Sequence, residues 1–360
     1  MNAENYFSKR VTLTAKGIAV VLMLFHHLFY DAPGLVDRYA VSAAPLPWPA
    51  LNSLSFYGKI CVAIFVFLTG YGMAVNLSSK DTLHRQRYAV SRFLKLECGF
   101  VFIYLLTILS SFLAPNRFAA YFTEGHAKGI LLMVFDAVGR ANFFGTPTYN
   151  GTWWYMSFAI FLIFLMPIAV KLHEQFGICM VAIAALITDF GIDSSRAFAL
   201  YLFSLSLGIW AAQSGAAGKI RSRCQSPGTK WLFLAGSLIL FVLFSAIRIK
   251  WGYYAWTDGL ISLTFLAFLF ILIDLIGVRL RLMEVFGKYS MTIFLTHTLI
   301  YNHYFSSFIY APKNWFLILL LLAAVSLGCA IVIEGLRRLV RWDRLPIWHI
   351  SERMPAARSE

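Results

Sequence analysis

The sequence predicts an all-α polytopic membrane protein with about ten transmembrane helices. Hydrophobic residues make up 59% of the 360 residues and charged residues only 13%, about half the charged share of a soluble domain. The 33 phenylalanines, 17 tyrosines and 10 tryptophans fit lipid-facing helices with aromatic belts at the membrane interfaces. Apolar segments of membrane-spanning length recur along the chain and are flanked by basic residues.

The net charge of +14 does not indicate a nucleic-acid partner, because the lysines and arginines flank apolar segments and form no separate basic domain. Five scattered cysteines, without a Cys-x-x-Cys pair, indicate neither a disulfide framework nor a metal site. We therefore expect no bound metal and no tightly bound cofactor. The expected surroundings are membrane lipids.

Ten apolar segments are predicted, with the fifth shorter than a bilayer span. The first is expected to remain as an uncleaved helix, because the nearest small-residue cleavage pattern lies far beyond its apolar core. The segments cover residues 11–30, 54–76, 93–114, 153–170, 177–190, 197–215, 231–249, 253–277, 286–305 and 315–334.

The distribution of lysine and arginine predicts the orientation in the cell membrane. With ten spans, 21 basic residues lie on the side of the two termini and eight on the other side, so both termini are expected in the cytoplasm. Residues 1–341 are expected to form one integral membrane domain, and 342–360 a short cytoplasmic tail. The stretch 115–152 is then outside the cytoplasm, and its apolar middle, 129–137, is expected on the membrane surface.

The first apolar segment carries ionisable residues on one face. Lys16 and His27 are eleven residues apart, which is about 20° after three turns and about 16 Å along a helix axis. His26 points about 80° away, and Asp31 follows His27 by one turn and could hold its imidazole. Alternatively, Lys16 snorkels to the interface, His27 packs between helices and Asp31 is a loop residue. Because ionisable residues in a span usually line a bundle interior, a functional site is favoured.

Five stretches resemble the acyltransferase-3 family of integral membrane O-acyltransferases, in the same order along the chain. The family opens with an Arg-x10-His pattern in its first helix, and Lys16 stands here for the arginine. Thr69 and Lys95 replace a serine and an arginine of the family pattern. The matching stretches are Lys16-Gly-Ile-Ala with His27, Ile64-Phe-Val-Phe-Leu-Thr-Gly-Tyr71, Arg92-Phe-Leu-Lys95, Thr152-Trp-Trp-Tyr-Met156 and Phe286-Gly-Lys-Tyr-Ser-Met-Thr-Ile-Phe-Leu-Thr-His297.

The resemblance implies transfer of an acyl group, often acetyl, from cytoplasmic acyl-CoA, as co-substrate, to a hydroxyl of a cell-surface polysaccharide or its lipid-linked precursor. His27 would act as a general base or carry the acyl group, and the sequence does not separate these roles. Its expected catalytic companions are Lys16 and Asp31.

Two further groups of residues have a functional and a structural interpretation. Arg85, Arg87, Arg92 and Lys95 could hold the phosphates of the donor, or could follow the positive-inside rule alone. Trp153, Trp154 and His297 could bind the glycan acceptor, or could form an aromatic belt and pack between helices.

The alternative function is a polysaccharide exporter or transporter of the same fold without acyl-transfer chemistry. Transporters often have symmetric halves and paired broken helices, and the sequence shows neither pattern. An exporter should tolerate a His27→Gln substitution, whereas an acyltransferase should lose transfer. The identity of the acceptor and the oligomeric state stay open.

Overall fold

The computed structural model describes residues 5–111, 118–123, 125–188, 197–252 and 255–353. Those residues form helices and turns, with no β-strand among them. Contacts divide the chain into two compact units, each made of segments distant in sequence. The first unit comprises Met1–Val36, Ser42–Ser79 and Ile168–Ser290, and the second comprises Asp37–Val41, Lys80–Pro167 and Met291–Glu360.

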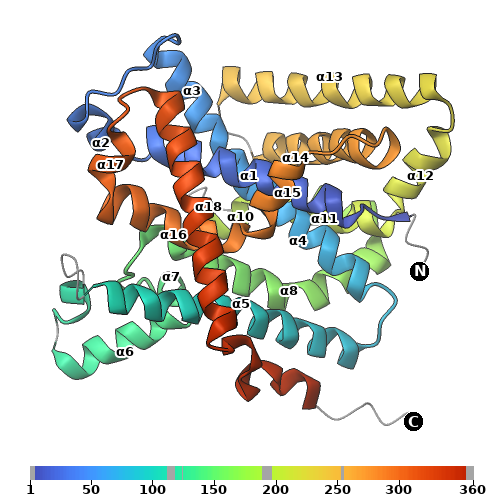
Figure 1. Ribbon diagram of the computed structural model, residues 1–360. Coiled ribbons are helices and arrows are strands. Elements are labelled where there is room, and N and C mark those ends of the chain that lie inside the picture. Colours follow the sequence, from blue (N-terminus) through green and yellow to red (C-terminus); the bar gives the residue numbers. More distant parts are fainter. Residues whose placement is uncertain (1–4, 112–117, 124, 189–196, 253–254, 354–360) are drawn as a thin grey trace. The chain divides into compact units, whose positions relative to one another are not determined.

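The helices of the first unit include the N-terminal helix and most of the middle of the chain (Figure 1). A 3₁₀ turn, Gly58–Ile60, joins α3 to α4, and a π-helix, Ile271–Leu275, continues α14. The helices are α1 (Lys9–Phe29), α2 (Pro33–Arg38, which enters the second unit), α3 (Trp48–Tyr57), α4 (Cys61–Leu77), α9 (Ile178–Leu186), α10 (Ala197–Leu200), α11 (Leu202–Gln213), α12 (Ala216–Arg223), α13 (Pro227–Trp251), α14 (Ala255–Phe270) and α15 (Arg281–Lys288).

The second unit contains the long α5 and the C-terminal helices. Short 3₁₀ turns cover Phe118–Tyr121, Gly151–Trp153, Trp342–Arg344 and Pro346–Arg353, and a π-helix covers Leu299–Tyr304. The helices are α5 (Thr82–Ser110), α6 (His126–Ala137), α7 (Ala141–Phe144), α8 (Trp154–Phe176, whose end belongs to the first unit), α16 (Ser290–Thr298), α17 (Ser306–Tyr310) and α18 (Trp315–Leu339).

Seven helical segments of the described chain are long and apolar enough to cross a membrane, and they meet seven of the ten predicted spans. The fifth prediction, 177–190, corresponds to the nine-residue α9 and extends beyond the described residues; the sixth, 197–215, corresponds to the short helices α10 and α11. The ninth, 286–305, breaks at Tyr289 and becomes a π-helix. The count of ten and the cytoplasmic termini stay predictions. The seven are Lys9–Phe29, Trp48–Leu77, Thr82–Ser110, Gly151–Phe176, Pro227–Trp251, Ala255–Leu275 and Trp315–Leu339.

Capping residues define where several of these helices begin. The side chain of Ser8 accepts a hydrogen bond from the backbone N–H of Val11, and Asp81 does the same for His84 at the start of α5. Asn314 caps α18 by accepting from two backbone N–H groups of its first turn. Each cap satisfies a donor that the first helical turn leaves unpaired, so helix formation begins at that residue.

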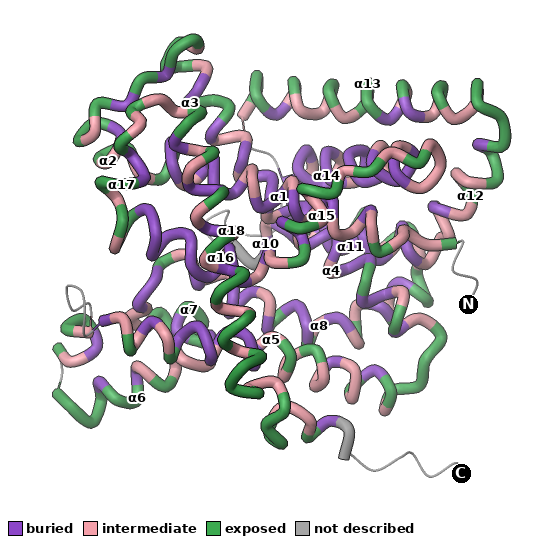
Figure 2. Tube along the Cα trace, in the orientation of Figure 1, coloured by how far each residue is buried: buried purple, intermediate pink, exposed green. Residues whose placement is uncertain are grey.

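Helix α1 is the packing centre of the first unit. It contacts α3, α4, α14 and α15. In the 18-residue apolar stretch of α1, 61% is buried, whereas only 17% of the corresponding stretch of α13 is buried. Figure 2 shows this difference in burial between the two helices. The exposed apolar face of α13 is therefore suited to lipid. At the crossing of α1 and α15, a Cβ on Gly17 would overlap a carbonyl of α15, and one on Gly287 would overlap a carbonyl of α1. These two glycines belong to two of the motifs above, and they let the two backbones touch.

Candidate active site

The C-terminal end of α1 brings His27 and Asp31 together. The His27 Nδ1 lies 2.7 Å from the Asp31 Oδ2, and the two residues are one helical turn apart. Because a carboxylate oxygen can only accept, Nδ1 carries the proton, and the neutral ring keeps its lone pair on Nε2. The side chain of His27 is 16% exposed and that of Asp31 is 42% exposed. The pair combines the partly shielded imidazole and the orienting carboxylate that acid–base chemistry uses.

His26 is held differently from its neighbour. Its Nδ1 donates to the backbone carbonyl of Ser55 at 2.9 Å, and its ring stacks on Tyr30 with centroids 5.2 Å apart. Its Nε2 lies 3.6 Å from the Asp31 Oδ1. The ring is buried, so His26 lies near the same carboxylate from inside the protein, at a distance too long for a hydrogen bond.

Lys59 adds a positive charge to this end of the first unit. It follows Gly58, where a Cβ would lie 2.6 Å from the carbonyl oxygen of Leu22 and 3.1 Å from the Cβ of His26. The glycine therefore allows the turn between α3 and α4 to approach α1 closely. The charge of Lys59 lowers the pKa of Asp31.

The surroundings of Asp31 favour its ionised form. Burial raises the pKa of this carboxyl, but the hydrogen bond from His27 and the charges of His26, His27 and Lys59 lower it by more. The net pKa of Asp31 lies below its ordinary value, so the carboxylate is available to orient the His27 imidazole near neutral pH.

Lys16 lies three turns before His27 on α1 and is half-buried. The neighbouring Gly17 is at the crossing with α15, so close contact between the backbones of α1 and α15 fixes the position of the segment around Lys16. A catalytic or donor-binding role for Lys16 stays a prediction.

The first unit also contains a buried ion pair that the sequence reading missed. The Nε of Arg248 on α13 lies 2.5 Å from the Oδ1 of Asp258 on α14, and neither side chain is exposed. The Arg248 guanidinium also lies 5.2 Å from the ring centroid of Phe56 and 5.3 Å from that of Tyr57, beside the turn that carries Lys59. Arg248 and Asp258 lie near the facing ends of the consecutive predicted segments 231–249 and 253–277, where an antiparallel pairing would bring the two charges together.

The predicted donor-binding residues all lie on α5, in the second unit. Arg92 and Lys95 are exposed, whereas Arg85 is buried and its Nε donates to the backbone carbonyl of Lys80 at 2.8 Å. The Nε and Nη2 of Arg87 are shielded from solvent and have no hydrogen-bond acceptor among the described residues. Two arginine donors in this state fit an anionic group such as a phosphate.

The predicted acceptor-binding residues also belong to the second unit, where packing accounts for their contacts. Trp153 is buried among aromatic side chains, and its indole N–H donates to the carbonyl of Leu295 at 3.0 Å. Trp154 is half-buried and stacks on Phe158. An acceptor role for either tryptophan stays a prediction.

His297 is fully buried in α16. Its Nδ1 donates to the carbonyl of Phe294 at 2.8 Å, so the neutral ring can accept at Nε2 from the hydroxyl of Thr298, 3.2 Å away. Thr298 in turn lies 3.2 Å from the hydroxyl of Thr152. These bonds hold the ring in one orientation and link two of the motifs noted in the sequence.

The helices and the histidine–carboxylate pair define a multi-pass membrane protein with a candidate acid–base site. The model of a family described as "Acyltransferase domain" matches residues 14–335, which include every residue of the three predicted groups of site residues. The chain therefore belongs to the acyltransferase-3 family of membrane acyltransferases. No curated protein and no solved structure matches it.

Proposed function

We propose that the protein is a membrane-bound O-acyltransferase. It moves an acyl group, which we expect to be acetyl, from cytoplasmic acyl-CoA to a hydroxyl of a cell-surface polysaccharide or its lipid-linked precursor. The observation that carries this proposal is the 2.7 Å contact between His27 Nδ1 and Asp31 Oδ2, within a chain whose family is acyltransferase.

In this proposal the Nε2 of His27 takes the proton of the acceptor hydroxyl. The hydroxyl oxygen attacks the thioester carbonyl, the ester C–O bond forms, the C–S bond breaks, and the sulfur of CoA receives the proton from the imidazolium. Asp31 stabilises the imidazolium while the proton resides on the ring. The same Nε2 could instead form an acyl-imidazole that the hydroxyl then attacks, so the geometry of the pair serves either route.

The Nε and Nη2 groups of Arg87, which have no hydrogen-bond acceptor among the described residues, support an acyl donor that carries phosphate groups. The exposed charges of Arg92 and Lys95 on the same helix add to the local positive charge. The mix of buried and exposed basic residues favours anion binding over the positive-inside rule as their explanation. That rule requires basic residues on the cytoplasmic side but no guanidinium shielded from solvent. Coenzyme A carries phosphates that such residues can bind.

The test is transfer of radiolabel from acetyl-CoA to host glycan by the purified full-length protein in proteoliposomes. His27→Gln should lower the rate about 10²- to 10⁴-fold, the usual contribution of a general base. His126→Gln, at an exposed position of α6, is the matched control and should keep the wild-type rate. Wild-type transfer by His27→Gln, or no transfer by folded wild-type protein from several acyl-CoAs, would contradict the proposal.

A further inference from the structure

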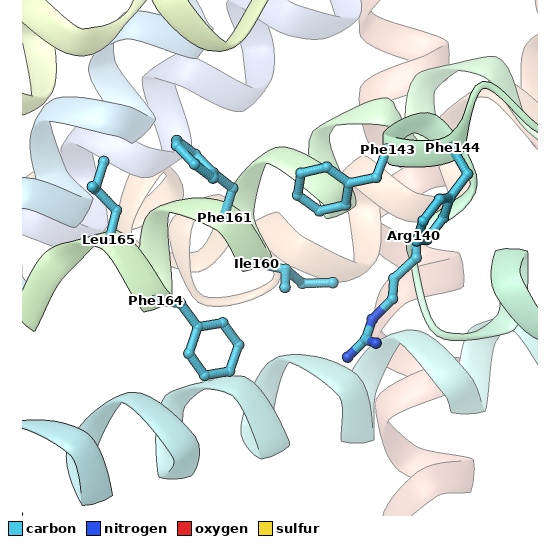
Figure 3. Close-up of a pocket in the computed structure, with 7 residues that line it drawn as sticks. All are labelled: Arg140, Phe143, Phe144, Ile160, Phe161, Phe164 and Leu165. Carbon is cyan, nitrogen blue, oxygen red and sulfur yellow. The ribbon is translucent and has the colours of Figure 1, made fainter.

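An open pocket of about 490 Å³ lies in the second unit, between α7 and α8. Its volume falls in the range of small-molecule sites. Figure 3 shows one cation among apolar side chains, with the guanidinium extending from α7 toward α5. The lining residues are Arg140, Phe143, Phe144, Ile160, Phe161, Phe164 and Leu165.

This pocket lies beside the middle of a candidate membrane span. Its α8 residues, from Ile160 to Leu165, lie at the centre of the span Gly151–Phe176. The segment just before Arg140 is fixed beside the first turn of α8, because the Ser157 hydroxyl donates to the carbonyl of Gly139 at 2.6 Å. Residues that the sequence assigned to an external loop are therefore held near the start of the candidate span, and the pocket extends from there along α8.

Arg140 is an exposed cation at that level. Its guanidinium lies 5.8 Å from the ring centroid of Phe93 on α5, and in the described part of the chain no carboxylate is within ion-pairing distance. Its charge influences Glu97, which is buried in α5 one turn beyond Phe93. A cation that faces the apolar side chains of a membrane span is costly unless an anion compensates it, and such residues usually mark a functional site.

The walls of the pocket are suited to a hydrocarbon chain. Phe144 is 61% exposed and Phe164 is 46% exposed, and Phe164 belongs to the candidate membrane span Gly151–Phe176. A guanidinium binds a phosphate through two parallel N–H donors. The pocket thus offers a phosphate site next to an apolar groove.

We propose that this pocket, bounded by Arg140 and the phenylalanines of α7 and α8, binds an anionic phospholipid of the surrounding bilayer. The phosphate contacts the Arg140 guanidinium, and one acyl chain lies along Phe143, Phe144, Phe161 and Phe164. This site is separate from the proposed acyl-transfer residues and does not depend on their activity.

The test is native mass spectrometry of the full-length protein released from detergent with phosphatidylglycerol or with phosphatidylcholine of the same acyl chains. Wild-type protein should bind phosphatidylglycerol about tenfold more tightly, since the choline ammonium compensates the phosphate charge of the other lipid. Arg140→Ala and Arg140→Gln should both lose this preference. Arg38→Ala, at an exposed arginine of α2, is the matched control and should keep it.

Three results would overturn the proposal. The first is equal binding of the two lipids by the wild type, and the second is an unchanged preference in Arg140→Gln. The third is displacement of phosphatidylglycerol by farnesyl phosphate at one tenth of its concentration, because the preferred occupant would then be an isoprenoid phosphate. Phe144→Ala should weaken binding of both phospholipids about equally, since it removes contact with the acyl chain and leaves the cation.

Discussion

Replacing Asp31 with asparagine tests whether the carboxylate assists His27. The substitution keeps the size of the side chain and removes the negative charge that lies 2.7 Å from the imidazole Nδ1. In the transition state the imidazole gains a proton, so the lost interaction is that between a carboxylate and an imidazolium. Such an interaction stabilises the transition state without being needed to bind the donor.

The expected size of the effect follows from the kind of bond. A hydrogen bond to a charged group contributes about 1.5–3 kcal/mol, and each 1.36 kcal/mol is about tenfold in rate. Asp31→Asn should therefore lower kcat about 10- to 150-fold, with the KM for acetyl-CoA nearly unchanged. Because the pKa of Asp31 lies below its ordinary value, the carboxylate stays ionised from about pH 5 to about pH 8, and the deficit should be constant over that range.

The assay is single-turnover transfer from radiolabelled acetyl-CoA in proteoliposomes, repeated across that pH range. Asp37→Asn, at an exposed acid a few residues further along the chain, is the matched control and should leave kcat unchanged. The reasoning would be refuted by wild-type kcat in Asp31→Asn, or by an equal loss in Asp37→Asn. A loss confined to the KM for acetyl-CoA would equally refute it, because the carboxylate would then act in donor binding.

Three further substitutions test the structure through melting temperature, measured by gel filtration of heated samples. Gly17→Ala should lower it by about 2–10 °C through overlap at the α1–α15 crossing, while Gly72→Ala, which has open space around its Cβ position, should not. Arg248→Met should destabilise the folded protein by about 3–5 kcal/mol because it leaves the Asp258 charge buried without its partner. Combining Arg248→Met with Asp258→Leu should recover most of the lost stability. An absence of recovery would refute the pairing. Burial raises the pKa of Asp136 by more than its three hydrogen bonds lower it, so the native state holds its proton to higher pH than the unfolded chain, and stability falls as pH rises above about 4. Asp136→Asn should remove that fall, and parallel pH profiles would contradict it.

The features that the sequence alone predicts, at the His27 site and in the membrane spans, are those that depend on local geometry. Residues four apart can approach each other at a helix end, so the sequence predicts that Asp31 could hold His27, with a loop position for Asp31 as the alternative. The structure places Asp31 just beyond the end of α1, with its Oδ2 2.7 Å from the His27 Nδ1. Helix length and hydropathy are likewise properties of single segments, and seven predicted spans are met. The ninth segment was read as one helix because its hydropathy is continuous, but the backbone breaks at Tyr289, where α15 crosses α1 and α16 begins.

The contacts of Trp153 and Arg140 could not be predicted from local sequence patterns. An interfacial tryptophan and a buried one have the same sequence neighbourhood, and only the aromatic cluster around Trp153 shows that it is buried. Arg140 belongs to the stretch 115–152 that the sequence assigns to an external loop, and only the bond between Ser157 and Gly139 places it beside the first turn of α8.

By itself, the sequence determined that this is a helical membrane protein of the acyltransferase-3 family, with His27 in the first helix and Asp31 four residues further along the chain. Those properties depend on composition and on the regular repeat of a helix. Only the tertiary structure decided that Ser55 holds His26, that Arg248 pairs with Asp258, and that Arg140 borders a pocket. Each of these depends on backbone segments distant in sequence meeting in space, which no local pattern encodes.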